Sequence, residues 1–247
     1  MGTRGAYGFI KHKEIKASYN HYDSYLEGLG VNMVDFVNST SKEELNKICD
    51  SIILVEQTDK PNKEQDIEIS KFLEENGLEN EHEVKNFGNG ERDWYYILRN
   101  CQGLPQFFKN GLRYMTNDKE FIDDHLFCEY AYLIDLDNDK FIIKSDDREV
   151  IYDLENIPDN WIEITYPQLE NKCKSKYMNI MYDKSEEQQK EILKELGLDS
   201  YIESNFDRYN YYTIENNYND VLNNIKETEL EGILDKYLSK DKDLEVA

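Results

Sequence analysis

The chain has 247 residues, of which 52 are Asp or Glu and 29 are Lys or Arg, so its formal net charge is −23. Direct binding to nucleic acid needs a basic face, and this composition argues against it. Hydrophobic residues make up 39% of the chain and aromatic residues 13%, which is enough apolar material for a core. The sequence therefore predicts a folded acidic protein rather than an acidic disordered tail.

The cysteines and the hydropathy pattern predict a cytoplasmic protein without metal or cofactor. No N-terminal targeting segment is recognisable, and no stretch approaches the roughly 20 apolar residues of a membrane span. The cysteines lie far apart without a CxxC pair, which excludes a zinc ribbon or a thioredoxin-type motif. We expect them to be buried or free thiols: Cys49, Cys101, Cys128 and Cys173.

The first elements are predicted to be a hairpin, a polar loop and a helix. Residues 5–10 and 14–19 flank a short polar turn, which is typical of a strand pair. Residues 20–30 combine turn-forming and aromatic residues, so a loop is expected there. A helix is predicted from Val31 to Val37.

Two further helices are expected before residue 79. Ser41 begins a capping box, and apolar residues at helical spacing run from Leu45 to Ile53. The next helix is predicted over 59–76, with Gly77 as its stop. The charged segment 79–90 is predicted to be a surface loop.

The middle of the chain combines short helices with a second hairpin. Helices are expected at 94–98 and 104–112. The runs 130–136 and 140–144 are rich in β-forming residues and flank an Asp/Asn turn, which predicts a hairpin.

Beyond position 166 the pattern becomes mostly helical. Ser185 begins another capping box, and apolar residues at helical spacing continue towards the C-terminus. We therefore expect an α+β fold, an antiparallel sheet with flanking helices. The core domain is predicted over 1–166 and a helical C-terminal region over 167–247, with a soft boundary.

The Asp-rich turn imitates the start of a calcium-binding EF-hand loop. Asp135, Asp137 and Asp139 have the spacing of the first ligands, and Asp146 stands at the twelfth position. The sixth position is Lys140 rather than Gly, and the pattern continues as a strand instead of a helix. A hairpin tip is therefore the preferred interpretation.

His125 and Cys128 have a spacing that can pair a base with a nucleophile on a helix. The element that follows is predicted to be a strand, and no third group is identifiable that would orient the base. A histidine at a helix end beside a buried cysteine is preferred. Phosphate-binding glycine loops, HExxH and a serine elbow are absent from the sequence.

The loop at 20–25 is the main candidate site, because it gathers an amide, an imidazole, a carboxylate and hydroxyls. Its candidate residues are Asn20, His21, Asp23, Ser24 and Tyr25. Two interpretations stay open. The loop is a polar pocket floor, or it is a hydrogen-bonded turn whose Asp and Ser cap the next element, which is their commoner role.

Thr3 and Arg4 complete the candidate pocket. An N-terminal nucleophile (Ntn) hydrolase needs Cys, Ser or Thr at the exposed first position, where the α-amine serves as base. Gly2 takes that position once Met1 is removed, so trimming to Thr3 would be required. An acylase-like site is therefore possible but disfavoured.

Four segments, MGTRG, YNHYDSYLEGLG, DWYYILRNCQG and HLFCEYAYLIDLDNDKF, together resemble a family of uncharacterised phage and prophage proteins. Its members begin with MGTRG, carry an NHYDSY-type loop and contain a CEYAY-type strand before an Asp-rich turn. The resemblance covers residues 1–30 and about 93–145. It implies a viral or prophage origin and brings no established activity.

The preferred hypothesis is a phage-derived acidic binding protein in the host cytoplasm, without enzymatic activity. It would inhibit a host nucleic-acid-handling defence system, of anti-CRISPR or anti-restriction type, by placing carboxylates against a basic protein surface. The alternative is an Ntn-like amidohydrolase or small-ligand-binding enzyme that uses Thr3, Arg4 and the loop from Asn20 to Tyr25. An assembly role in the phage particle also stays open, and acidic surfaces can serve solubility alone.

Overall fold

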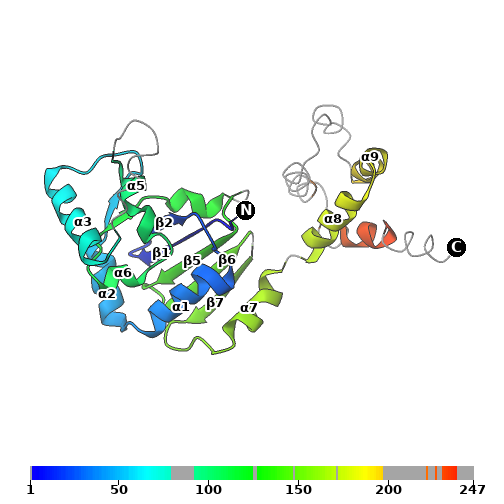
Figure 1. Ribbon diagram of the computed structural model, residues 1–247. Helices are drawn as coiled ribbons and strands as arrows, with labels where there is room; N and C mark the ends of the chain where they lie inside the picture. The colour runs from blue at the N-terminus through cyan, green and yellow to red at the C-terminus, as the bar shows by residue number, and fades with distance from the viewer. Residues whose placement is uncertain are drawn as a thin grey trace. The chain divides into compact units, whose positions relative to one another are not determined.

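The structure is a computed structural model that describes residues 2–78, 92–124, 127–146, 148–170, 172–196, 221, 226 and 230–237. The chain divides into two compact units, one ending at Leu169 and the other beginning at Glu170. The first unit contains a mostly antiparallel five-stranded sheet with flanking helices (Figure 1), which confirms the predicted α+β class.

The main sheet has the strand order β2-β1-β5-β6-β7. Its strands are β1 (Gly5–Lys11), β2 (Glu14–Asn20), β5 (Tyr130–Asp135), β6 (Lys140–Ser145) and β7 (Arg148–Asp153). β1 and β5 are parallel, and the other neighbours are antiparallel. Both predicted hairpins are confirmed, whereas β7 was not predicted.

One face of this sheet carries large apolar side chains, and helices cover it (Figure 1). The sheet side chains on this face include Tyr7, Phe9, Tyr132, Ile134, Phe141, Ile143 and Val150. The helices are α1 (Val31–Asn38), α2 (Lys42–Ser51), α3 (Lys63–Glu75), α5 (Trp94–Leu98), α6 (Gln106–Lys109) and α7 (Trp161–Leu169). Each of them contributes buried side chains to the same core, because apolar residues recur on one side of each helix.

The opposite face of the sheet has a smaller apolar cluster built largely from small residues. Ala6, Ala17 and Ala131 are buried there beneath Cys128 and the 3₁₀ helix η3 (Lys119–Asp123). Small side chains let these covering segments approach the strands closely.

The two hairpin tips are joined by a carboxylate. Asp137 accepts hydrogen bonds from the main-chain N–H groups of His12 and Lys13, both at 2.8 Å. Asp135 in turn accepts from the N–H groups of Asp137 and Asn138, at 3.0 and 3.1 Å. These bonds confirm the hairpin-tip interpretation of the Asp-rich segment, since its carboxylates order turns.

We expect Asp137→Asn to lower the free energy of unfolding at neutral pH but not in acid. The N–H groups of Lys13 and His12 hold the pKa of Asp137 below its ordinary value. The contribution of the ionised form is therefore complete above the unfolded-state pKa of about 4 and is lost as the pH falls through the folded-state pKa. Urea unfolding of both proteins between about pH 7 and pH 3 measures this, and a constant difference would contradict it.

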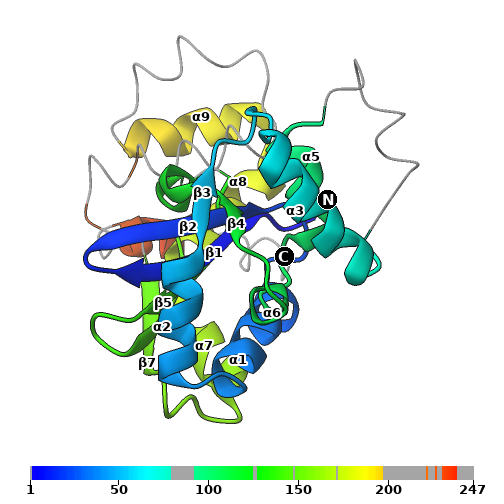
Figure 2. The same ribbon diagram turned by 90° about the vertical axis from the view of Figure 1, so that its left-hand side faces the viewer.

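Helix α2 ends earlier than predicted, and a short strand follows it. The helix stops at Ser51, and Ile53, expected on its buried side, is 36% exposed in β3 (Ile53–Val55). The Lys16 ammonium donates to the carbonyl oxygens of Cys49 and Ile52, both at 2.8 Å, which satisfies carbonyls at the helix end. β3 pairs in parallel with β4 (Tyr114–Thr116), and the two run side by side in Figure 2.

Three other predicted boundaries are corrected. The helix expected from residue 59 begins at Lys63, because Asn62 and Gln65 form a reciprocal capping box. The helix expected over 104–112 is limited to α6, and Gly111 leaves the helical region with φ +102°. The loop expected over 20–30 ends in a π-helical turn, η1 (Leu26–Gly30), that leads into α1.

The second unit is helical where it is described. It contains α8 (Lys172–Asp183), α9 (Glu186–Glu195) and helical residues over 230–237, which share one apolar core. The predicted capping box at Ser185 is confirmed, with Gln188 as its partner. Pro167, next to the predicted domain boundary, lies inside α7. No helix in the described ranges is both long and apolar enough to cross a membrane.

The surface loop predicted over 79–90, the Tyr- and Asn-rich segment 201–218 and His125 lie outside the described residues.

Candidate functional site

The predicted loop at 20–25 is held by its own polar groups. Asn20 and Ser24 are buried, and the Asn20 amide donates to Ser24 Oγ at 2.8 Å and to the Tyr22 carbonyl. The Tyr132 hydroxyl donates to the Ser24 carbonyl at 2.8 Å, and the Ser24 N–H donates to the Thr3 carbonyl at 3.0 Å. The side chains of Asn20 and Ser24 are thus engaged in fixing the loop to the strands beneath it.

Asp23 and Tyr25 contribute to the loop through their main chains. Asp23 adopts a left-handed conformation, with φ +51°, and its carbonyl accepts from the Leu29 N–H at 2.8 Å. The Tyr25 carbonyl accepts from the Gly28 N–H at 3.0 Å. Both side chains are exposed, whereas the side chains of Asn20 and Ser24 are buried.

Arg4 lies where the N-terminal segment meets the residues before β5. Its N–H donates to Glu129 Oε1 at 3.1 Å, and its carbonyl accepts from the Glu129 N–H at 3.0 Å. The Arg4 guanidinium lies 5.3 Å from the centre of the Phe127 ring, a cation–π contact.

A second group of side chains forms what we call the cationic aromatic cluster, made of Arg4, Tyr19, His21, Tyr22, Tyr95 and Arg99. The Tyr19 hydroxyl is 2.7 Å from His21 Nδ1, and the His21 and Tyr22 rings meet edge to face with centres 4.2 Å apart. Arg99 donates to the hydroxyls of Tyr22 and Tyr95, at 3.0 and 3.3 Å. Its guanidinium lies 5.9 and 5.6 Å from the centres of these two rings.

The guanidiniums of Arg4 and Arg99 act on two titratable groups of the cluster. Burial lowers the pKa of His21, and the guanidiniums of Arg99 and Arg4 lower it further. Burial also raises the pKa of Tyr19, which the same two guanidiniums oppose. The imidazole is therefore neutral at pH 7, so its Nδ1 can accept from the Tyr19 hydroxyl.

Sequence reasoning found two members of this cluster, Arg4 and His21, and missed the others. Tyr22 and Arg99 are far apart in the sequence, and their contact depends on how α5 is placed against the loop. The dense aromatic and basic run DWYYILR was the signal that could have drawn attention to Arg99.

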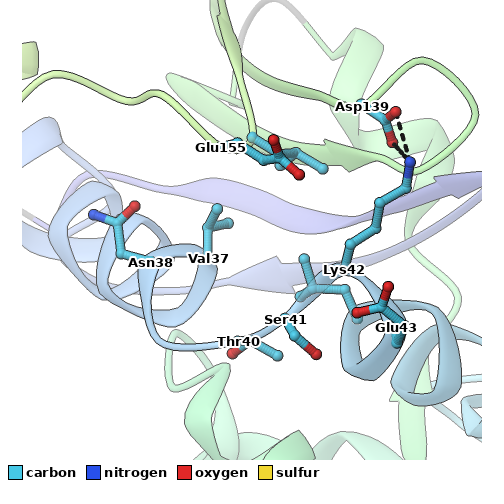
Figure 3. Close-up of a pocket in the computed structure, with 10 residues that line it drawn as sticks. Val37, Asn38, Thr40, Ser41, Lys42, Glu43, Asp139 and Glu155 are labelled. Carbon is cyan, nitrogen blue, oxygen red and sulfur yellow. Dashed lines mark hydrogen bonds and ion pairs between the residues drawn. The ribbon is translucent and has the colours of Figure 1, made fainter.

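A groove forms where the end of α1 and the start of α2 face the turns beside β6 and β7 (Figure 3). Its volume is about 360 Å³. The buried side chains of Val37, Leu45 and Leu154 line its apolar part. The charged side chains on its rim are Lys42, Glu43, Asp139 and Glu155. We call this feature the acidic groove.

The acidic groove is lined by three carboxylates and one ammonium. The Lys42 ammonium is 2.6 Å from the Asp139 carboxylate, and Figure 3 shows Glu155 and Glu43 lining the groove apart from that pair. The hydrogen bond to Asp139 raises the pKa of Lys42, and the nearby charges of Glu155 and Glu43 add to the effect. The groove therefore retains an excess of negative charge.

The three cysteines whose side chains the structure describes are poor candidates for catalysis. Burial raises the pKa of the Cys101 and Cys128 thiols to about 12 and also raises that of Cys49. These thiols stay protonated at neutral pH, whereas the nucleophilic form is the thiolate. Within the described residues, no three His, Cys, Asp or Glu side chains are grouped so that they could hold a metal ion.

No family model, curated protein or solved structure significantly matches the chain. Function is therefore inferred from the acidic groove.

Proposed function

We propose that the protein is a phage-derived binding protein that inhibits a host nucleic-acid-handling defence system, of the anti-CRISPR or anti-restriction type. Its partner would be a host protein with a basic, nucleic-acid-binding surface. The observation that supports this proposal is the acidic groove, which is lined by three carboxylates and by one ammonium that is already paired with Asp139.

The groove suits an Arg or Lys side chain of a partner. Val37, Leu45 and Leu154 offer apolar surface to the methylene stem of such a side chain. Within the described part of the chain, no hydrogen bond or ion pair engages the carboxylates of Glu43 and Glu155. A guanidinium can therefore bind them with charge-assisted hydrogen bonds.

The net charge of −23 favours the same kind of partner at longer range. A strongly negative protein approaches a basic groove faster than a neutral one, and its carboxylates can occupy the places of phosphates. Inhibition would follow because the partner's nucleic-acid site is then blocked.

The enzymatic alternative is an Ntn-like amidohydrolase or a small-ligand-binding enzyme, and its Ntn-like form requires Thr3 as a free N-terminal nucleophile. Intact-mass measurement separates the two functions, because a chain that starts at Gly2 has no such nucleophile. The hydrogen bonds of Asn20 and Ser24 within the loop give this alternative no added support.

We expect the double variant Glu43→Gln/Glu155→Gln to bind its basic partner about 10-fold or more weakly, because two charge-assisted bonds are lost. The partner is first captured from host lysate at low salt and at about 0.5 M salt, which screens charge pairs. Affinities of the purified pair are then measured by titration calorimetry.

The matched control is Glu74→Gln, which removes one exposed carboxylate on α3, outside the groove. It should bind within about twofold of the native chain, since exposed isolated charges contribute little. The proposal fails if no basic nucleic-acid-binding protein is captured at low salt, or if the double variant binds as tightly as the control.

A further inference from the structure

β7 is the last strand in the order of the main sheet, and alternate residues of it present their main chain to the outside. The Leu154 N–H donates to the Asp139 carbonyl at 3.0 Å, so these two residues form a hydrogen-bonded pair of the β6–β7 ladder. Such pairs recur at every second residue of an antiparallel ladder, which directs the main-chain groups of Val150 and Tyr152 towards β6. The N–H and C=O groups of Ile151 therefore point away from the sheet.

Glu149 has the same outward orientation as Ile151. Among the residues that the structure describes, no hydrogen bond engages the outward main-chain groups of these two residues. Helix α7 contacts β7 through the face that carries Tyr152, whose hydroxyl oxygen is 2.7 Å from Thr165 Oγ1. An unpaired row of N–H and C=O groups is a template for a further strand.

The side chains of the outward-pointing residues share one exposed face of the sheet. Glu149, Ile151 and Asp153 alternate along β7, and all three are exposed. Ile151 is 49% exposed and pairs with Ile142, which packs against the smaller apolar cluster on that face. An apolar side chain on an added strand would lie beside Ile151 and extend this apolar row.

We propose that β7 binds an extended basic segment of the partner as an added antiparallel strand. A basic side chain of the segment lies beside Glu149, an apolar one lies beside Ile151, and an arginine reaches the acidic groove. In strand addition, main-chain hydrogen bonds supply affinity and alternate side chains supply specificity. The inference rests on the proposed function, because it states the form in which the basic partner is recognised.

The edge of β7 leads directly into the acidic groove. Leu154 and Glu155, which line the groove, follow Asp153 at the end of the strand. Alternate residues of a strand are about 7 Å apart, so a segment that pairs with Ile151 and Asp153 brings its next side chain towards Glu155. One continuous segment can therefore occupy both the edge and the groove.

The charges along the edge favour a basic segment over a second copy of this chain. Two copies joined with Ile151 opposite Ile151 would set each Glu149 opposite the second copy's Asp153, and like charges placed directly opposite are destabilising. Asp153 already has Lys140 as an ion-pair partner, whereas no ion pair engages Glu149 within the described ranges. A lysine beside Glu149 is attracted instead, and the net charge of −23 adds to that attraction.

The experiment titrates the full-length protein with a synthetic peptide, acetyl-Arg-Thr-Lys-Thr-Val-Thr-Lys-amide, by calorimetry. In the antiparallel register its valine lies opposite Ile151, its second lysine lies opposite Glu149, and its arginine extends beyond Asp153. The comparison peptide carries N-methyl groups on that valine and that lysine, which removes two N–H donors and keeps every charge. We expect it to bind about 10-fold or more weakly, because hydrogen bonds to the edge are lost.

Amide hydrogen exchange shows where the peptide binds. In the free protein the N–H groups of Glu149 and Ile151 should exchange faster than those of Val150 and Tyr152, because only the latter two face β6. The unmodified peptide at saturation should slow exchange at Glu149 and Ile151 about 10-fold or more, since their N–H groups then donate to the added strand.

Ile151→Pro tests the donor on the protein's side of the pairing. The Ile151 N–H points outward, so proline removes one edge donor and leaves the ladder with β6 in place. The matched control is Ile151→Ala, which loses the same side chain and keeps the N–H. We expect the proline variant to bind the peptide about 10-fold more weakly than the alanine variant.

Three results overturn the proposal. The first is equal binding of the two peptides, because charge alone then explains the affinity. The second is exchange at Glu149 and Ile151 that saturating peptide leaves unchanged, which includes the case in which no peptide binds. The third is a dimeric free protein in which these two amides are already protected, because the edge then belongs to a second copy. The peptide comparison needs no variant, so it decides the matter even if Ile151→Pro does not fold.

Failure of this inference and failure of the proposed function are distinguishable. The peptide titration uses no host protein, so a negative result at β7 leaves the test of the groove with Glu43→Gln/Glu155→Gln unaffected. Conversely, failure to capture a basic host protein contradicts the proposed function and leaves the measured strand addition at β7 in place.

Discussion

Phe9→Ala is expected to lower the free energy of unfolding by about 3–5 kcal/mol, the usual loss for a large aromatic side chain removed from a core. Phe9 lies in the middle of β1, is 2% exposed and meets the rings of Phe36 and Phe108, each edge to face with centres 6.3 Å apart. The substitution leaves a cavity between the sheet and two helices that the surrounding side chains can fill only in part. Urea unfolding followed by tryptophan fluorescence measures the loss.

Ile67→Ala provides the comparison for this core variant. Ile67 is a large apolar residue on α3 but is 63% exposed, so its removal should change the free energy of unfolding by less than about 0.5 kcal/mol. Equal losses in the two variants would mean that Phe9 is not part of the cooperative core.

Gly28→Ala is expected to lower the free energy of unfolding by about 1–3 kcal/mol, because the added methyl group collides with the main chain. A Cβ atom at this position would lie 2.0 Å from the carbonyl oxygen of Asp23, which is main chain and cannot rotate away. Moving that oxygen also disturbs its hydrogen bond with the Leu29 N–H, which fixes the start of the π-helical turn. The same unfolding measurement tests this prediction.

Glu27→Ala is the neighbouring control. It places alanine in the same turn and removes one exposed hydrogen bond, from the Tyr166 hydroxyl to the Glu27 carboxylate at 3.0 Å. It is expected to lower the free energy of unfolding by less than about 1 kcal/mol. A result in which Gly28→Ala is no more destabilising than Glu27→Ala would show that the loop tolerates a shift of Asp23.

Helices and strands whose caps and turns lie close in the sequence could be predicted from it. Element boundaries that depend on residues far away in the sequence could not. The hairpins and the Ser41 and Ser185 caps depend on side chains a few residues away, so their patterns predicted them. The end of α2 depends on Lys16, far away in the sequence, and an apolar repeat that continues past Ser51 gives no sign of it. The three-residue strands β3 and β4 are too short to show a period.

The candidate sites also differ in whether their residues are close together in the sequence or are brought together only by the fold. The loop at 20–25 was visible because its polar residues are consecutive, although the structure uses Asn20 and Ser24 to hold the loop. The acidic groove and the cationic aromatic cluster both join distant positions, Lys42 with Asp139 in the groove and Tyr22 with Arg99 in the cluster. Only the fold brings such pairs together, and neither pair belongs to a motif of fixed spacing.

The parallel pairing of β1 with β5 has a consequence for synthesis of the chain. Gly5 pairs with Tyr130, so β1 leaves the ribosome on the order of ten seconds before its central neighbour is made. During that time the first hairpin presents a hydrogen-bonding edge that no later strand yet covers, and such edges invite pairing with other chains. A nascent chain that stalls before residue 130 therefore exposes what becomes the middle of the sheet.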